Sequence, residues 1–474
     1  MKTSKKVLAI VLSVALVLAL SVTAFAVTIT RDPAAATGNG SIKVTLPTAD
    51  EGYTAENTYK IYKVFDATLS ADGTSVVYTL VDGKTEPPAG FELNAAGNVV
   101  YSGGESATGL SAADIAALKA YVADLTPIAT VTTTTSDTEF TVDNLPYGYY
   151  YIDTTTGSAV SVDNITPDVE VNDKNEYPPV DKTITGASYV DADGKRAMAQ
   201  VGTSVTYQAS ITKEAGAENY EFHDNMDAGL SYNNDMIVKV GGLVVAPGAN
   251  TFSIDLDGDD TVKVTFDNDY IASLADDTVI TFTYSATVTS DALQLDPAKN
   301  TAHLTYGHEP GSNSTPIKET KVYNARIEVL KTDDEDKPLA GAEFVLKNSE
   351  GKYYSISNNV VSWVDSIDAA TKRVSGADGK MDPFTGLADG TYTLVETKAP
   401  DGYNKSDDTP ITINGGDYTA DNLIKNATVI NKPGKALPST GGIGTTIFYV
   451  IGSMLLLAAA IVLIARRRMA ADAM

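Results

Sequence analysis

The sequence predicts an all-β protein of tandem immunoglobulin-like β-sandwich domains, with one helix in the first domain and a transmembrane helix near the C-terminus. Three observations support this fold class. Val, Ile, Thr and Tyr alternate with polar residues through most of the chain, which is typical of strands with one buried face. Gly, Asn-Gly and Asp-Gly separate these segments, as in sandwiches. An uncharged apolar run, 443–465, is long enough to cross a hydrocarbon core of about 30 Å as a helix.

The N-terminal segment has the features of a secretory signal peptide, 1–26. Lys2, Lys5 and Lys6 precede an apolar run, and small residues offer a cleavage point after Ala26. The exported chain is then about 410 residues long up to the anchor, which suggests roughly three domains.

Composition limits the partners and the chemistry. The chain has 61 acidic and 35 basic residues, a net charge of −26, which argues against nucleic acid as a partner and for a soluble, self-repelling surface. It has no cysteine, although an exported protein could use disulfides. Thiol catalysis and thiolate metal sites are excluded, so any covalent cross-link must use other chemistry.

The first domain is expected at 27–176. Its predicted strands include 42–46, 58–65, 76–81 and 140–142, and a further strand follows 145–148. Ser111 can cap a helix whose apolar residues fall on one face and should pack against this domain; they are Ile115, Leu118, Val122 and Leu125. The segment Tyr177-Pro178-Pro179 predicts a rigid linker.

The second and third domains are expected at 180–322 and 323–433, each opening on a strand with a lysine and closing on a strand with an asparagine. Residues two apart in a strand share a face. In the third domain this places three polar residues on apolar faces. They are Lys331 with Ile327 and Val329, Glu396 with Tyr392 and Leu394, and Asn431 with Val429.

Three buried polar groups are costly unless they meet. Burial disfavours charge, so it lowers the pKa of Lys331 and raises the pKa of Glu396. A neutral amine can attack the side-chain carbonyl of Asn431 while the acid polarises it and moves protons. The product is a Lys–Asn isopeptide bond, with ammonia released.

The second domain repeats this pattern. Lys182 shares a face with Val180 and Ile184, and Asp224 shares one with Phe222. Asn300 falls on the apolar face of its own strand. From spacing alone, a buried ion pair, or lysines that extend outwards to solvent, explains both domains more simply than a covalent bond does.

The C-terminal segment 437–468 resembles the cell-wall sorting signal of Gram-positive surface proteins. Leu437-Pro438-Ser439-Thr440-Gly441 is a Pro-containing, extended and protease-accessible motif, and it precedes the apolar run and a basic tail, 466–474. The arginines would hold that end on the cytoplasmic side. The resemblance implies that a sortase cleaves Thr440–Gly441 and transfers the Thr440 acyl group to an amine. A plain single-pass anchor is the alternative.

Further motifs resemble the shaft, or backbone, pilins of Gram-positive sortase-assembled pili. The segment 392–403, YTLVETKAPDGY, is similar to the E-box of Cna B-type domains, which implies that Glu396 promotes a Lys331–Asn431 bond. The strands of Lys182 and Asn300 resemble the Cna A-like middle domain of such pilins, with Asp224 as promoter.

The segment 169–175, VEVNDKN, resembles the pilin motif, usually VxVYPKN. The resemblance implies that Lys174 accepts Thr440 of the next subunit. Here Asn172 and Asp173 replace Tyr-Pro. Because side chains alternate between the two faces of a strand, Lys174 is expected on the polar face, away from Val169 and Val171. Lys182 and Lys331, in contrast, are expected to face inwards.

The first domain is expected to lack an isopeptide bond. Lys43 points away from the face of Ile42 and Val44, and Thr154 stands where the promoting Glu would fall. Asp153, next to that position, keeps the alternative open.

Enzyme activity is a rival reading, but the three histidines do not form a catalytic set, because His223 and its neighbour Asp224 face opposite ways in a strand. The others are His303 and His308. The acidic segments 255–259 and 333–336 could bind Ca²⁺ but complete no known loop and are read as solvated turns. No cofactor is predicted, and amide formation within the chain is self-modification.

The expected function is that of a polymerised, wall-anchored pilin (fimbrial) subunit at the cell surface. The expected partners are a sortase, copies of the same chain, minor pilins and peptidoglycan, with a host or surface ligand unassigned. A monomeric wall-anchored adhesin, or a minor or basal pilin, is the alternative, and it needs no acceptor at Lys174.

Overall fold

The computed structural model describes most of the chain after the first 26 residues. The described residues are 27–35, 37–48, 53, 56–71, 75–102, 110–154, 160–164, 168–173, 177–214, 216, 218–293, 296–307, 310–311, 313–416, 418, 423–435 and 443–471. The predicted signal peptide, Lys174, His308 and the 437–441 motif lie outside these ranges.

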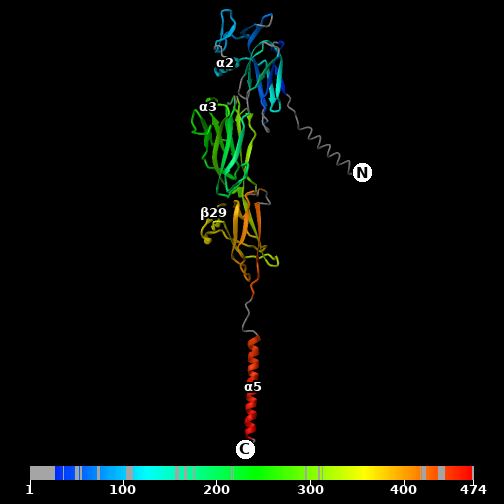
Figure 1. The fold of residues 1–474 in the computed structure, drawn as a ribbon, viewed down its shortest axis with the longest axis vertical. Coiled ribbons are helices and arrows are strands. Elements are labelled where there is room, and N and C mark those ends of the chain that lie inside the picture. Colours follow the sequence, from blue (N-terminus) through cyan, green and yellow to red (C-terminus); the bar gives the residue numbers. More distant parts are fainter. Residues whose placement is uncertain are drawn as a thin grey trace, which may run out of the picture.

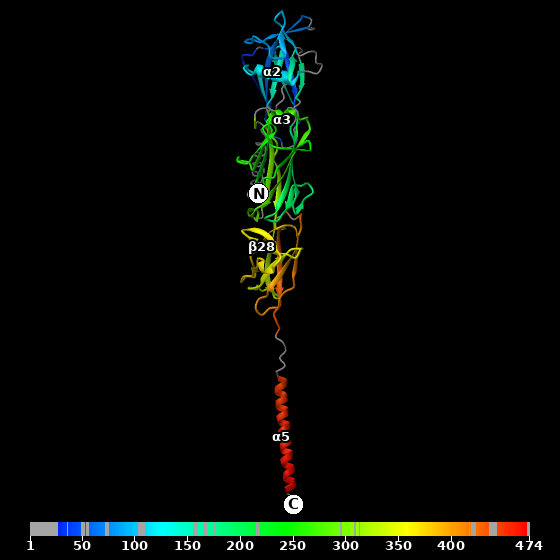
Figure 2. The same ribbon diagram turned by 90° about the vertical axis from the view of Figure 1, so that its left-hand side faces the viewer.

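The molecule is long and narrow. Three β-domains follow one another in chain order along one axis, and helix α5 (Ile443–Ala471) continues that line beyond the third domain (Figure 1). A view turned by 90° shows the same succession, so the domains form a rod (Figure 2).

The first domain contains two sheets, ordered β1-β7-β3-β4-β6-β5 and β11-β2-β8, with β9 and β10 attached to the first through β3. Helix α2 packs on this domain because Leu118 and Val122 are buried in an apolar cluster with Phe65 and Tyr151. Ser111 caps α2, and Asp114 completes a capping box. The predicted helix is therefore confirmed. The elements are β1 (Thr28–Arg31), β2 (Gly40–Thr45), β3 (Glu56–Leu69), β4 (Val76–Leu80), β5 (Phe91–Leu93), β6 (Val99–Tyr101), α2 (Ala112–Val122), β7 (Ala129–Thr134), β8 (Glu139–Leu145), β9 (Gly148–Thr154), β10 (Val160–Asn164) and β11 (Asp168–Asn172).

The second domain is a sandwich of two larger sheets, ordered β12-β15-β22-β18-β19 and β13-β14-β25-β23-β16-β21-β20, with β17 on β22 and β24 on β23. Its elements are β12 (Val180–Gly186), β13 (Tyr189–Val190), β14 (Arg196–Met198), β15 (Ser204–Lys213), β16 (Glu221–Met226), β17 (Leu230–Tyr232), β18 (Ile237–Val240), β19 (Leu243–Val245), β20 (Phe252–Asp255), β21 (Val262–Phe266), α3 (Asn268–Ser273), β22 (Thr278–Val288), the 3₁₀ helix η1 (Ser290–Leu293), β23 (Ala298–Tyr306), β24 (Asn313–Ser314) and β25 (Lys318–Tyr323).

The third domain has a three-stranded sheet, β31-β26-β34, facing a sheet ordered β29-β28-β27-β32-β33 with β30 attached to β27. Its first and last strands, β26 and β34, are parallel neighbours. The elements are β26 (Ala325–Asp333), β27 (Glu343–Lys347), β28 (Tyr353–Ser357), β29 (Val360–Val364), the 3₁₀ helix η2 (Ile367–Ala369), β30 (Arg373–Val374), β31 (Phe384–Leu387), β32 (Gly390–Lys398), β33 (Thr409–Ile413) and β34 (Ile424–Asn431).

Two details of the second domain differ from the sequence-based expectation. The asparagine strand β23 does not close this domain, because β24 and β25 follow it and β25 pairs with β23. The short helix α3 was also not predicted; its six residues carry only one fully buried apolar side chain, Ile271, too few for a helical period to show.

The second and third domains are joined more tightly than the first and second. One apolar cluster runs through both of them without a break, whereas the first domain has two clusters of its own. At the junction Trp363 Nε1 donates to Gln200 Oε1 (2.5 Å), and Gln200 Nε2 donates to the Val361 carbonyl (3.2 Å). At the other junction, Asn57 Nδ2 donates to the Tyr177 hydroxyl (2.8 Å).

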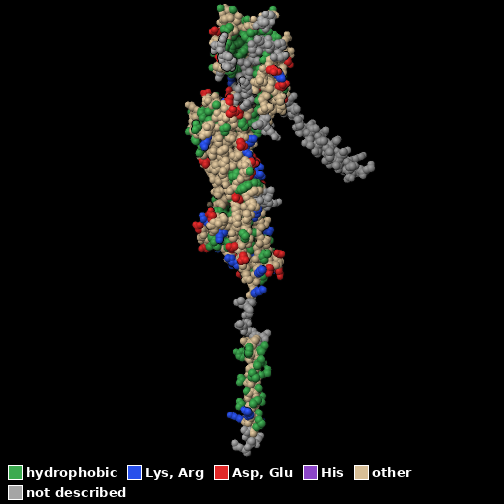
Figure 3. All heavy atoms as spheres, viewed as in Figure 1, with side chains coloured by type: hydrophobic (Ala, Val, Ile, Leu, Met, Phe, Trp, Pro, Cys, Tyr) green, Lys and Arg blue, Asp and Glu red, His purple; other side chains and the backbone are tan. Residues whose placement is uncertain are grey.

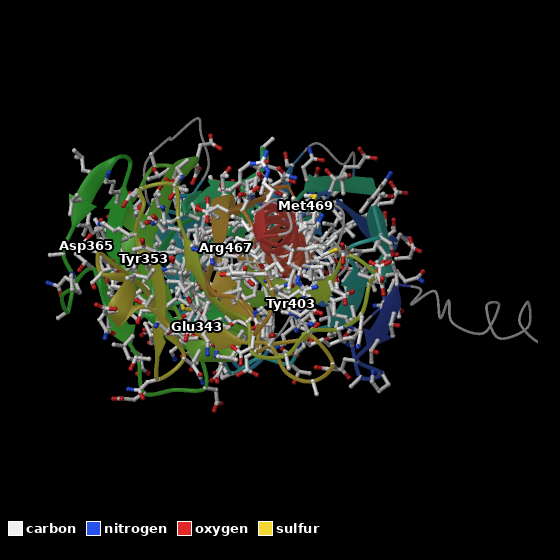
Figure 4. The ribbon with its side chains drawn as sticks, turned by 90° about the horizontal axis from the view of Figure 1, so that it is seen from below. Glu343, Tyr353, Asp365, Tyr403, Arg467 and Met469 are labelled. Carbon is white, nitrogen blue, oxygen red and sulfur yellow. The ribbon has the colours of Figure 1, made fainter. Side chains whose placement is uncertain are left out.

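Helix α5 packs against none of the described residues of the domains. Its segment Gly444–Met469 is long and apolar enough to cross a membrane and is not buried by the rest of the chain. Hydrophobic side chains cover its described length, and basic ones lie near its far end, where Arg466–Arg468 continue the helix (Figure 3). Seen from below, α5 lies end-on, with Arg467 and Met469 at its near end (Figure 4).

Candidate functional site

The second domain brings its three predicted residues into one place between the sheets. Lys182 extends from β12 in one sheet, while Asp224 on β16 and Asn300 on β23 extend from the other. Asp224 lies opposite Ala302, two residues from Asn300 on the neighbouring strand, so both side chains leave the same face. All three are fully buried, with 0% of each residue exposed.

A tyrosine completes this group. The Lys182 amine donates to the Asp224 carboxylate and to the Tyr284 hydroxyl, and that hydroxyl donates to the same Asp224 oxygen, Oδ2. Tyr284 lies on β22, in the sheet that also holds Lys182. Lys182, Asp224, Asn300 and Tyr284 therefore form one buried polar cluster in an otherwise apolar core.

Several polar atoms of this cluster have no hydrogen-bond partner among the described residues. They are Asp224 Oδ1 and both polar side-chain atoms of Asn300. Asn300 nevertheless lies close enough to the Tyr284 hydroxyl to oppose the rise in the Tyr284 pKa. An unpartnered buried amide costs about 1–3 kcal/mol, so the cluster is unfavourable unless these atoms react or shift.

Burial also changes the protonation of the nucleophile. It lowers the pKa of Lys182, and the Asp224 carboxylate offsets part of that effect. Burial and the same carboxylate raise the pKa of Tyr284 well above its ordinary value, so the phenol keeps its proton. Burial therefore favours the uncharged amine of Lys182, which is its nucleophilic form.

The third domain forms a similar cluster with different supports. Lys331 on β26 is 0% exposed, and Glu396 and Asn431 are each 1% exposed. Asn431 Nδ2 donates to Glu396 Oε1 (2.8 Å), and the Ser406 backbone N–H donates to Glu396 Oε2 (2.6 Å). The Lys331 amine donates to the carbonyls of Thr332 (2.8 Å) and Val429 (3.0 Å).

Lys331 lies near the Glu396 carboxyl group that Asn431 contacts, although the Lys331 amine itself donates to backbone carbonyls. The parallel register pairs Lys331 with Val429, two residues before Asn431. Burial lowers the pKa of Lys331, while Glu396 and Asp333 offset part of this effect. The carbonyl oxygen of the Asn431 side chain has no hydrogen-bond partner among the described residues. Glu396 instead contacts the Nδ2 atom of this amide.

The described part of the first domain buries no lysine. Lys43 lies on the surface side of β2, where it pairs with Glu139 (2.9 Å) and with Glu170 on β11 (3.8 Å). The Glu139 hydrogen bond raises the pKa of Lys43, which is the opposite of the shift seen for the two core lysines. Thr154 is buried, at 4% exposure.

The strand β11 carries the predicted pilin motif up to Asp173. Val171 is buried, whereas Glu170 and Asn172 are exposed, so the strand alternates as expected. Asp173 accepts a hydrogen bond from the Tyr59 hydroxyl (2.7 Å). Lys174 itself and the sortase motif residues Leu437, Pro438, Thr440 and Gly441 lie outside the described residues.

The rival sites are surface features. His223 faces away from Asp224 and contacts Asp260 (2.6 Å) and Thr305, and its ring stacks on His303 (4.6 Å between ring centres). Asp255 and Asp333 accept hydrogen bonds from backbone N–H groups of their own turns. Within the described ranges, no group of three or more His, Cys, Asp or Glu side chains could hold a metal ion.

Sequence reasoning missed Tyr284 and Ser406. Tyr284 shares the inward face of β22 with Phe282 and Ala286, so the strand pattern predicts only that it is a core residue. Only the pairing of strands across the sandwich shows that its hydroxyl meets Lys182. Ser406 acts through its backbone, which no side-chain pattern reveals.

Two family models match the C-terminal part of the chain. Residues 325–428 match the SpaA prealbumin-like fold domain, and residues 430–470 match the LPXTG cell wall anchor motif. No curated protein sequence matches the chain.

Solved structures similar to the chain include several backbone pilins. The T6 backbone pilin of serotype M6 Streptococcus pyogenes is 17% identical with a TM-score of 0.55, covering 80% of this chain and 81% of that chain. The group B streptococcus pilus 2b backbone protein is 26% identical with a TM-score of 0.44, covering 54% and 99%. The major pilin SpaD of Corynebacterium diphtheriae is 18% identical with a TM-score of 0.45, covering 84% and 98%.

These comparisons establish the fold and the location. The chain shares its overall fold with a three-domain backbone pilin and contains a prealbumin-like third domain. It ends in a cell-wall anchor motif that includes the exposed apolar helix α5. It is a cell-wall-anchored surface protein whose precursor is held in the membrane.

Proposed function

We propose that this chain is the repeating structural subunit of a covalently polymerised pilus shaft. A sortase joins Thr440 of one subunit to Lys174 of the next, and isopeptide bonds Lys182–Asn300 and Lys331–Asn431 reinforce the second and third domains. The fold shared with a backbone pilin and the LPXTG anchor motif support this proposal. Sortase and neighbouring copies of the chain are the partners, and the last subunit is attached to peptidoglycan.

Each internal bond forms by exchange of one amine for another. The lysine gives a proton to the promoter, Asp224 or Glu396, and its lone pair attacks the asparagine Cγ. The Cγ–Nδ2 bond then breaks, and Nδ2 leaves as ammonia after receiving a proton from the attacking nitrogen. The promoter then passes the lysine proton to the departing ammonia, so it ends unchanged. The lysine and the asparagine are consumed, so each domain reacts once, which is self-modification rather than enzymatic turnover.

The bond between subunits also forms by exchange of the group attached to a carbonyl carbon. The sortase replaces Gly441 on the Thr440 carbonyl, which leaves the residues after the cleavage point with α5 in the membrane. The Lys174 amine then displaces the sortase and forms an amide. Lys174 comes two residues after the end of β11, and the alternation of that strand predicts that its side chain faces solvent, where an acyl-enzyme could approach it.

One observation carries the proposal of a shaft. Tension in such a fibre would enter a subunit at Lys174 and leave at Thr440. Both domains between these points bury a lysine, a carboxylic acid and an asparagine together, whereas the described part of the domain before Lys174 buries no lysine. The internal bonds therefore lie where the fibre carries load.

Replacement of the acceptor tests this proposal. Lys174→Ala should abolish the ladder of high-mass species on denaturing gels, while the monomer stays folded and attached to the wall. Lys239→Ala is the matched control, because Lys239 is an exposed lysine of β18 that faces solvent. A persistent ladder in Lys174→Ala, or its loss in both variants, would contradict the proposed acceptor.

A further inference from the structure

The Tyr284 hydroxyl contacts both groups that must exchange a proton in the second domain, and these two groups also contact each other directly. It accepts a hydrogen bond from the Lys182 amine and donates one to the Asp224 carboxylate. Tyr284 is 1% exposed, and its ring stacks on Tyr207, with 5.7 Å between ring centres. No water is needed to connect the two groups.

In the third domain, backbone groups make the corresponding hydrogen bonds, accepting from the lysine amine and donating to the carboxyl group. Carbonyls of Thr332 and Val429 accept from the Lys331 amine, and the Ser406 N–H donates to the Glu396 carboxylate. In the second domain, no backbone group of the described residues donates to the Asp224 carboxylate or accepts from the Lys182 amine. The Tyr284 hydroxyl alone makes both kinds of hydrogen bond there, one from the amine and one to the carboxylate.

We propose that Tyr284 is a third catalytic group of the Lys182–Asn300 bond, which orients the lysine amine and relays its proton to Asp224. The inference rests on the proposed isopeptide chemistry and adds to it a residue that the third domain lacks. In the described part of the third domain, no tyrosine hydroxyl bonds the Lys331 amine or the Glu396 carboxyl group, so the requirement is specific to the second domain.

The proposed relay balances. Lys182 passes a proton to the Tyr284 oxygen as the phenol passes its own proton to Asp224, so the tyrosine is unchanged. The proton leaves along the N–H···O bond, so the amine lone pair at first points at the Tyr284 oxygen. Rotation about the Cε–Nζ bond then turns the lone pair towards Asn300. Asn300, the unpartnered group of the cluster, is the remaining polar neighbour and the electrophile.

The core supplies a matched control for this residue. Tyr207 lies on β15, stacks on Tyr284 and is also buried, and its ring lies 5.3 Å from the Lys182 amine. Its hydroxyl, unlike that of Tyr284, has no hydrogen-bond partner among the described residues. Tyr284→Phe and Tyr207→Phe thus remove the same atom from two neighbouring rings, one inside the cluster and one outside it.

The experiment follows the loss of ammonia by intact-mass spectrometry after synthesis of residues 27–435, which α5 does not contact. In Tyr284→Phe, the second domain should lose its ammonia at least about tenfold more slowly, because general acid–base groups contribute factors of this size or more. The third domain serves as an internal clock and should react at the wild-type rate, and Tyr207→Phe should match the wild type in both domains.

Two further measurements separate catalysis from packing. Loss of packing lowers the rate equally at every pH, whereas removal of a proton relay moves the pH at which the rate is half-maximal. 4-Aminophenylalanine at position 284 can both donate and accept, so it should restore the rate, and it remains informative where Tyr284→Phe does not fold.

The outcomes distinguish the inference from the function on which it rests. A wild-type protein that keeps both ammonia molecules contradicts the isopeptide bonds themselves. Tyr284→Phe at the wild-type rate, equal slowing in Tyr207→Phe, or slowing with an unchanged pH profile would each overturn the role of Tyr284 while leaving the bonds intact.

Discussion

Lys182 and Lys331 are the two described lysines with no exposed surface, and their surroundings differ from those of an ordinary buried lysine. Lys213 is also buried, at 7% exposure, but its amine reaches the partly exposed Asp276 near the surface. Lys182 instead contacts Asp224 beside Asn300, and Lys331 lies near Glu396, which contacts Asn431. A buried ion pair alone gives little net stability. The neighbouring asparagines place a side-chain carbonyl near each lysine, as the proposed bonds require.

Glu396→Ala should leave the third domain without its bond. The intact mass of residues 27–435 should rise by one ammonia molecule relative to the wild type, beyond the change expected from the substitution. Loss of a cross-link of this kind costs about 2–5 kcal/mol by analogy with disulfides, so protease should cut this domain faster. Glu350→Ala, at an exposed glutamate of the same domain, should change neither property. Equal masses for Glu396→Ala and Glu350→Ala, after correction for the equivalent substitution, would contradict the role of Glu396.

Stability should depend on pH once the bond is prevented. In Asn431→Ala, Lys331 stays buried, and its pKa in the folded state is below the ordinary value of 10.5. The unfolded state then binds more protons between the two pKa values, so the free energy of unfolding should rise with pH up to about pH 10 and fall as pH falls towards the folded-state pKa. Thermal unfolding across that range measures this slope. Lys331→Met combined with Asn431→Ala should lack it, and parallel curves for the two proteins would refute the account.

The sequence alone predicted the faces of these residues but not all of their contacts. Period two placed Lys182, Asp224 and Asn300 on inward faces, because alternation is a local property of one strand. Which inward residues meet depends on strand order across two sheets. The link from Lys182 to Tyr284 could therefore not be predicted, since their strands are separated by β15 within the sheet.

The parallel strands β26 and β34 determine how the third domain responds to force. Tension would run along β26 to Lys331, cross the proposed bond to Asn431 and continue into the C-terminal tail. The chain between these two residues carries none of it. In the second domain the proposed bond takes the tension across from Lys182 to Asn300, so the chain between them carries none. Strands β24 and β25 follow Asn300 and would still carry the tension.

Single-molecule pulling checks this path. A chain held at both ends should show no extension from within the third domain, because the bond spans it. Glu396→Ala should add an unfolding event on the order of 300 Å, the extended length of the segment released between Lys331 and Asn431. The same event in the wild-type protein would show that no bond closes this domain.

The boundaries of helices and strands could be predicted where a capping residue or a long uncharged apolar run marks them. Ser111 identified the start of α2, and the uncharged run identified α5. The helix continues through Arg466–Arg468 to Ala471, because nothing in that segment breaks a helix, whereas the predicted membrane span ended at Ala465. The position of β25 could not be predicted, since its pairing with β23 and β14 is non-local.

The whole molecule is a rod in which the second and third domains form one continuous apolar core. The first domain has separate cores and meets the second through polar contacts such as Asn57 to Tyr177. The acceptor Lys174 follows the first domain, and the donor Thr440 follows the third. A donor at one end and an acceptor further along the same chain form a head-to-tail contact that does not close, so the product is a filament.

Mass spectrometry of fibres released from the cell wall decides whether the chain polymerises in this way. After proteolytic digestion, the spectra should contain a branched peptide in which the Thr440 carbonyl is joined to the Lys174 side-chain nitrogen, and two more with Lys182 joined to Asn300 and Lys331 joined to Asn431. Thr440 found only on cell-wall peptide, with Lys174 unmodified in every copy, would instead show a monomeric wall-anchored protein.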